Sequence, residues 1–125
     1  MTKTRSQRYS TNALQLIRQF QTYEEADLKK GLGETRRWLD GLPGLVLVNG
    51  LIPVLLRLQQ QSTKDEVDEV AKNLLIDLEK QGFEATALTA IDSVGYMRSQ
   101  RQALEYLAWV KRWGQALLKT KEGNA

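Results

Sequence analysis

Apolar side chains recur every three to four residues along most of the chain, which is the spacing of one face of an α-helix. The first apolar stripe falls in about residues 5–21 and consists of Tyr9, Ala13, Leu16, Ile17 and Phe20. A second stripe falls in about residues 23–40, where Gly31 and Gly33 lower the helical propensity. No segment alternates strictly between apolar and polar positions, so strands are not expected.

The Leu42-Pro43 step predicts the start of a third helix, because a proline suits the first turn of a helix better than its interior. We expect a break at Asn49-Gly50. Pro53 then either kinks the continuing helix or lies in the first turn of a new one.

The remaining pattern predicts three more helical segments. The first covers about residues 64–81 and ends at Gly82, a suitable C′ residue. A short helix with Ala87, Leu88 and Ile91 is expected to stop near Gly95, and a last helix covers about residues 96–120.

Three segments fit the capping box, in which a Thr hydroxyl and a Glu or Gln side chain three residues later each bond the other's backbone amide. These segments are Thr4–Gln7, Thr22–Glu25 and Thr63–Glu66. With the apolar periods, they predict an all-α protein, a compact bundle of five to six helices. Residues 1–125 should form a single helical domain, with frayed ends at residues 1–4 and 121–125.

The chain contains no cysteine and no histidine. Disulfides, thiolate nucleophiles, thiolate zinc sites and histidine-based catalysis are therefore excluded, and we expect a protein that is not an enzyme. Asp65, Glu66, Asp68 and Glu69 are spaced to hold a divalent cation. They also suit the first turn of a helix, where acidic side chains complement the macrodipole, and we favour that interpretation. No metal and no cofactor are expected.

The N-terminus, residues 1–7, is polar and basic and is unlike a secretory signal. The longest apolar run, residues 42–58, is short for a membrane span and contains Asn49, Arg57 and two prolines. We therefore expect a cytoplasmic protein with no membrane partner.

The formal net charge of +3 conceals three blocks of alternating sign. Residues 1–62 hold nine Lys/Arg against five Asp/Glu, residues 63–93 three against eight, and residues 94–125 six against two. Such blocks suit a subunit that meets a polyanion and basic neighbours with different surfaces, although they also arise by chance in helical proteins.

At about 100° per residue, the last helix divides into three sectors. The core sector consists of Ala103, Leu107, Val110, Gly114, Leu117 and Leu118, and the opposite, outward sector of Arg98, Arg101, Glu105, Arg112 and Lys119. Tyr106, Trp109 and Trp113 lie between them. The cations either contact phosphates or form a solvated face, and Trp109 and Trp113 are expected to pack at a helix or subunit interface.

Two blocks resemble a known family. The segment Leu42–Leu51, with its Leu-Pro and Asn-Gly-Leu steps, is similar to a pattern in the small subunit of the type III-B (Cmr) CRISPR complex. Tyr96-Met97-Arg98, followed by residues 103–113, resembles that family's C-terminal signature.

The resemblance implies a non-catalytic subunit of a ribonucleoprotein effector in antiviral defence. Its copies would stack on one another and on the large polymerase-like subunit in an inner filament. That filament would run alongside the backbone subunits that hold the CRISPR RNA, and would contact the target RNA or the guide–target duplex. The candidate RNA-binding residues are Arg98, Arg101, Arg112 and Lys119, with Lys111 and Arg57 as outer candidates. The alternatives are a structural adaptor that does not touch RNA and the equivalent small subunit of a type III-A complex.

Overall fold

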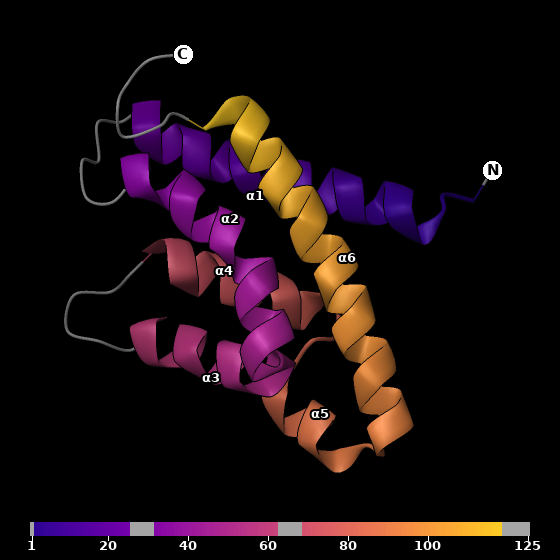
Figure 1. The fold of residues 1–125 in the computed structure, drawn as a ribbon. Coiled ribbons are helices and arrows are strands. Elements are labelled where there is room, and N and C mark those ends of the chain that lie inside the picture. The colour runs from indigo at the N-terminus through magenta and orange to yellow at the C-terminus, as the bar shows by residue number, and fades with distance from the viewer. Residues whose placement is uncertain (1, 26–31, 63–68, 119–125) are drawn as a thin grey trace. The chain divides into compact units, whose positions relative to one another are not determined.

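The computed structural model describes residues 2–25, 32–62 and 69–118, and these residues form six helices and no strand (Figure 1). The helices are α1 (Arg5–Glu25), α2 (Leu32–Asn49), α3 (Leu51–Ser62), α4 (Glu69–Lys80), α5 (Ala85–Ala90) and α6 (Ser93–Leu117). The predicted all-α fold is therefore confirmed.

The chain divides into two compact units, which we call unit 1 (residues 1–43 and 105–125) and unit 2 (residues 44–104). Helices α2 and α6 each begin in one unit and end in the other. No described helix is both long and apolar enough to cross a membrane.

Unit 1 has a core between α1 and parts of α2 and α6. Tyr9 and Tyr106 pack edge to face, with their ring centroids 5.5 Å apart. Gly114 lies against Ile17 and Leu39, so that the three helices approach closely there. The buried apolar side chains are Tyr9, Ala13, Leu16, Ile17, Phe20, Leu39, Leu42, Tyr106, Leu107, Val110 and Leu118.

Unit 2 has a separate core in which α3 packs against α4 and α5 (Figure 1). Its buried apolar side chains are Val46, Leu51, Val54, Leu55, Leu58, Ala71, Leu74, Leu78, Phe83, Leu88 and Ala103. The spacing of these positions along α3 and α4 is the three-to-four-residue period seen in the sequence.

The first capping box is confirmed. The Gln7 amide donates to Thr4 Oγ1 at 3.1 Å, and the Thr4 amide donates to Gln7 Oε1 at 2.8 Å. The second box is wrong, because α1 continues to Glu25 and the Thr22 hydroxyl donates to the Arg18 carbonyl inside the helix. The apolar side chains of α1 are buried as far as Phe20, and this burial stabilises one continuous helix over a break at Thr22. The third box, Thr63–Glu66, lies outside the described residues, as do Gly31 and residues 119–125.

Pro43 lies inside α2 and does not begin a new helix, so this prediction is wrong. A proline there removes a backbone hydrogen bond. The helix continues because Leu39 and Leu42 before the proline and Val46 after it are almost completely buried.

The prediction that Gly82 ends a helix is confirmed. Gly82 has a φ of 98°, and the Gly82 and Phe83 amides donate to the carbonyls of Glu79 and Leu78 at 3.0 Å each. This is a Schellman motif, and its apolar pair, Leu78 and Phe83, is buried.

Gly95 does not stop a helix, which corrects another prediction. The short helix ends at Ala90, before Ile91, and α6 begins at Ser93. Asp92 is its N-cap, since Asp92 Oδ1 accepts from the Gly95 amide at 2.7 Å. On the same helix Tyr106, predicted at the flank, is fully buried, and Leu117, predicted in the core, is half-buried.

The predicted break at Asn49-Gly50 is confirmed, and Pro53 lies in the first turn of the new helix α3. The first two amides of α3 are capped by side chains of α6. Leu51 donates to Gln100 Oε1 at 3.0 Å and Ile52 to Tyr96 Oη at 3.1 Å. Each contact has one end in a block that carries the family resemblance, Leu51 in the first block and Tyr96 in the second.

Gly50 should not tolerate a side chain. Its φ is +91°, and an added Cβ would lie 3.2 Å from Tyr96 Oη. Gly50→Ala is expected to lower the free energy of unfolding by about 1–2 kcal/mol, because L-residues are strained in this conformation. Gly41→Ala in α2, where nothing lies within 4 Å, should instead raise it by about 0.5–1 kcal/mol. Denaturant unfolding measures both, and equal effects would contradict this account of Gly50.

Candidate nucleic-acid interface

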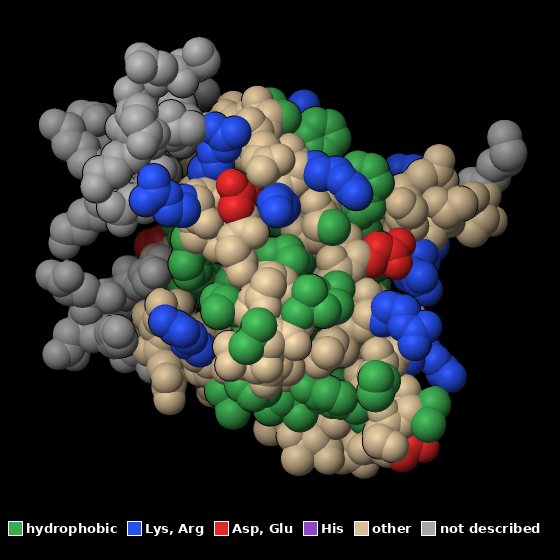
Figure 2. Space-filling view, viewed as in Figure 1, with side chains coloured by type: hydrophobic (Ala, Val, Ile, Leu, Met, Phe, Trp, Pro, Cys, Tyr) green, Lys and Arg blue, Asp and Glu red, His purple; other side chains and the backbone are tan. Residues whose placement is uncertain are grey.

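Helix α6 carries two exposed arginines in unit 2, Arg98 and Arg101. Residues three apart lie on one face of a helix, so these side chains are neighbours. Neither forms an ion pair with a residue that the structure describes. Figure 2 shows Lys and Arg side chains on the surface beside the lower half of α6. The structure thus leaves both guanidinium groups accessible to a phosphate.

In unit 1, α6 carries Lys111, which is half-buried, and Arg112, which is exposed. The Arg112 guanidinium lies over the Trp109 ring, 4.9 Å from its centroid. A guanidinium stacked on an indole keeps its N–H edges free, so it can still donate to an anion.

The remaining two candidate cations are Arg57 and Lys119. Arg57 is exposed on α3, and no contact places it beside Arg98 or Arg101. Lys119 lies outside the described residues.

Glu105, the one acidic residue of the predicted outward sector, is paired with a cation of α1. Its Oε2 lies 3.0 Å from an Arg5 guanidinium nitrogen, and both side chains are partly exposed. An exposed pair of this kind contributes little to stability, but it neutralises a charge that would repel phosphates. Burial raises the pKa of the nearby Tyr9 phenol, and Arg5 partly offsets this shift by favouring the phenolate.

Trp109 and Trp113 are both held against α1. Their indole N–H groups donate to the hydroxyls of Ser6 and Ser10 at 3.3 and 3.2 Å. Ser6 and Ser10 are four residues apart on α1, and Trp109 and Trp113 are four residues apart on α6. Successive turns of the two helices therefore lie opposite each other. The role of the two tryptophans at a subunit interface remains a prediction.

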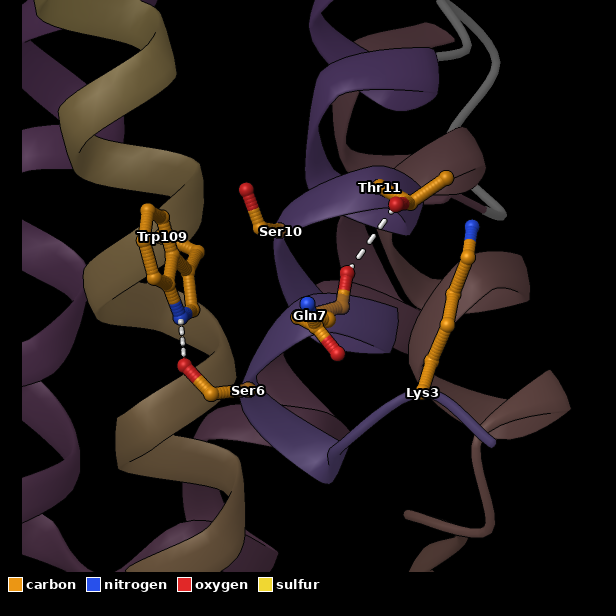
Figure 3. A pocket seen from close by; sticks show the side chains of 6 residues that line it. All are labelled: Lys3, Ser6, Gln7, Ser10, Thr11 and Trp109. Atoms are coloured by element: carbon orange, nitrogen blue, oxygen red, sulfur yellow. Dashed lines mark hydrogen bonds between the residues drawn. The ribbon is translucent and has the colours of Figure 1, made fainter. Parts of the chain in front are cut away.

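Trp109 also borders a groove of about 320 Å³ on unit 1 (Figure 3). Polar side chains near the start of α1 form the rest of its lining, which consists of Lys3, Ser6, Gln7, Ser10, Thr11 and Trp109. This groove was not predicted from the sequence. The one indication of the groove in the sequence was the series of polar residues at helical spacing along one side of α1.

The exposed large apolar side chains of the described residues all belong to unit 2. Val48, at the end of α2, is 82% exposed, and Met97, near the start of α6, is 61% exposed. The full set is Leu47, Val48, Leu56, Ile76, Ile91, Val94 and Met97. Figure 2 shows hydrophobic side chains on the surface where Figure 1 places α3 and α5.

Positive charge, unlike the exposed apolar side chains, is concentrated in unit 1. The sequence of unit 1 holds twelve Lys/Arg against seven Asp/Glu, whereas that of unit 2 holds six against eight. The excess of cations in unit 1 suits contact with a polyanion. Unit 2 combines exposed apolar side chains, which suit contact with protein, with the exposed cations Arg98 and Arg101.

Of the predicted acidic cluster, the structure describes Glu69. Glu69 lies exposed in the first turn of α4, where its charge complements the macrodipole. Asp65, Glu66 and Asp68 lie outside the described residues. Among the residues that are described, no three acidic side chains are grouped to hold a metal ion.

The fold and these surfaces define a small all-α protein in which α6 presents arginines that have no ion pair with any described residue. Residues 5–117 match the family model of a CRISPR-associated protein (Cas_Cmr5). The chain therefore belongs to this family and is a small subunit of the type III-B Cmr CRISPR complex. No curated protein matches the chain.

The tryptophan–serine pairs should contribute to the stability of unit 1. Ser10→Ala leaves the half-buried Trp113 indole N–H without its partner, so the free energy of unfolding should fall by about 1 kcal/mol, the usual net value of a hydrogen bond. The matched control is Ser99→Ala, on the half-buried side of α6, which removes no such bond. Denaturant unfolding measures the free energy of unfolding of both variants. Equal losses in the two variants would show that the indole hydrogen bond makes no net contribution to stability.

Proposed function

We propose that this Cmr subunit is non-catalytic and contacts the sugar–phosphate backbone of the target RNA or the guide–target duplex. The observation that carries the proposal is the exposure of Arg98, Arg101 and Arg112 along α6, without an ion pair to any described residue. Arginine suits this role because its planar fork donates two hydrogen bonds to one phosphate.

Phosphate contacts are sufficient for such a subunit. In an RNA-guided complex base pairing reads the sequence, so the protein needs only to recognise backbone and shape. A few contacts per copy bind weakly and depend on salt, and repetition of copies along one strand raises the effective concentration. We therefore infer that the copies stack side by side within the effector.

The exposed apolar side chains of unit 2 support the protein-contact part of this proposal. Val48 lies four residues before Ile52, and Met97 directly follows Tyr96, the residue that accepts from the Ile52 amide. Patches of this kind mark interaction surfaces in soluble proteins. They suit a neighbouring copy, the large subunit or a backbone subunit.

The non-catalytic role rests on the absence of histidine and cysteine from the sequence. We also propose a cytoplasmic location, where a CRISPR effector meets its target RNA. The Cmr family match supports the type III-B complex over the type III-A alternative.

The arginines of unit 2 provide the first test. In the assembled complex, Arg98→Glu with Arg101→Glu should weaken capture of target RNA. If both contact a single strand, the log–log salt slope should become shallower by about 1.4, since each phosphate contact contributes about 0.7. Lys72→Glu with Lys80→Glu on α4 makes the same charge change at exposed positions of the same unit and should leave capture unchanged.

Binding measured across a salt series separates the two main interpretations. Unchanged capture would remove Arg98 and Arg101 from the RNA-contacting surface. Loss of co-purification with the other subunits, with RNA affinity retained, would instead favour the structural adaptor.

The apolar surface provides the second test. Val48→Gln with Met97→Gln should reduce co-purification with the partner subunits. The free energy of unfolding of the isolated chain should stay within about 0.5 kcal/mol, because exposed side chains contribute little to it. Ala87→Gln with Ala90→Gln introduces two glutamines at exposed positions of α5 outside this apolar set and serves as the control. Full assembly of the double variant would exclude this surface from the interface.

A further inference from the structure

The groove beside Trp109 offers hydrogen-bond donors that have no partner within the described part of the chain. The Ser6 and Ser10 hydroxyls already accept the indole N–H groups, so each retains its own proton to donate. Gln7 uses Oε1 in the capping box, which leaves the two N–H bonds of Nε2 free. A ligand that accepts several hydrogen bonds would satisfy these groups together.

Positive charge surrounds the same groove. The Lys3 side chain forms one wall and Trp109 another (Figure 3). Arg8 is held close by, because its guanidinium donates to the Lys3 carbonyl at 2.9 Å. Arg112 stacks on Trp109 at 4.9 Å. Unpaired donors with nearby cations are complementary to an anion, and a phosphate is the one that RNA supplies.

Thr11, which also lines the groove, can act only as an acceptor toward a ligand. Its hydroxyl donates its proton to the Gln7 carbonyl at 3.0 Å, so its oxygen keeps only lone pairs. A ribose 2′-hydroxyl can donate to such an oxygen, whereas deoxyribose has no proton to give there. The indole supplies an apolar wall for a sugar or base.

We propose that this groove binds one phosphate and its ribose from a single strand of RNA. Lys3, Gln7 Nε2 and the two serine hydroxyls hold the phosphate, and Thr11 accepts from the 2′-hydroxyl. The volume of about 320 Å³ suits a single nucleotide unit, at the lower end of small-ligand sites. The inference rests on the proposed RNA contact but assigns it a second surface, in unit 1, separate from Arg98 and Arg101.

Gln7→Glu is the decisive variant. A glutamate keeps the oxygen that accepts from the Thr4 amide, and Thr-x-x-Glu is itself a capping box, so α1 is preserved. The same change replaces the free N–H donors by a negative charge. Gln15→Glu, exposed on the same helix and outside the groove lining, makes an identical charge change and is the matched control.

The experiment titrates the full-length chain with a short single-stranded RNA and follows the tryptophan indole N–H resonances, with Trp109→Phe assigning the Trp109 signal. We expect that signal to shift with RNA, and Gln7→Glu to weaken the apparent affinity by about tenfold, the effect of losing a charge-assisted hydrogen bond. Gln15→Glu should change it little. A DNA strand of the same sequence should bind more weakly than RNA.

Three results would overturn the proposal: equal effects of Gln7→Glu and Gln15→Glu, equal binding of DNA and RNA, or an equal shift of the Trp109 signal with inorganic phosphate alone. RNA capture by the assembled complex separates this proposal from the broader one. If Arg98→Glu with Arg101→Glu lowers capture and Gln7→Glu does not, the groove is excluded while the RNA contact of α6 stands. If neither lowers capture, both proposals fail.

Discussion

The organisation of this protein depends on the burial of one side of α6. Ala103 is buried in unit 2, and Tyr106, Leu107 and Val110 are buried in unit 1, so each core includes residues of this helix. A helix fixed along one side cannot turn its opposite side inward, because residues on its two sides differ by half a turn. The exposure of Arg98, Arg101 and Arg112 is therefore a consequence of core packing.

Much of this fold could be predicted from the sequence because the signals were local. The Thr4–Gln7 box, the Schellman glycine Gly82 and the break at Gly50 each depend on residues within one turn of the chain. The predictions at Thr22 and Pro43 were wrong because buried apolar residues nearby outweigh the local preference. Asp92 also carried a local signal as the N-cap of α6, although the last helix was predicted to begin at about residue 96.

The candidate site was predictable to a smaller extent. Helical periodicity alone indicates that Arg98 and Arg101 point outward, since it assigns the opposite side of the helix to the core. The pairing of Trp109 with Ser6 and the groove beside it depend on the register between α1 and α6. No pattern within either segment fixes that register, so the groove could be found only from the structure.

The bonds between distant segments also bear on how the chain folds as it is synthesised. Trp109 and Ser6 are 103 residues apart, and Ile52 and Tyr96 are 44 apart. The start of α3 therefore has no tertiary cap until Tyr96 has left the ribosome, and Ser6 of α1 has no partner from α6 until Trp109 has done so. Contacts of such long sequence separation slow folding because the connecting segment must lose entropy first. Until Trp109 has left the ribosome, the nascent chain thus carries the apolar side of α1 uncovered by α6.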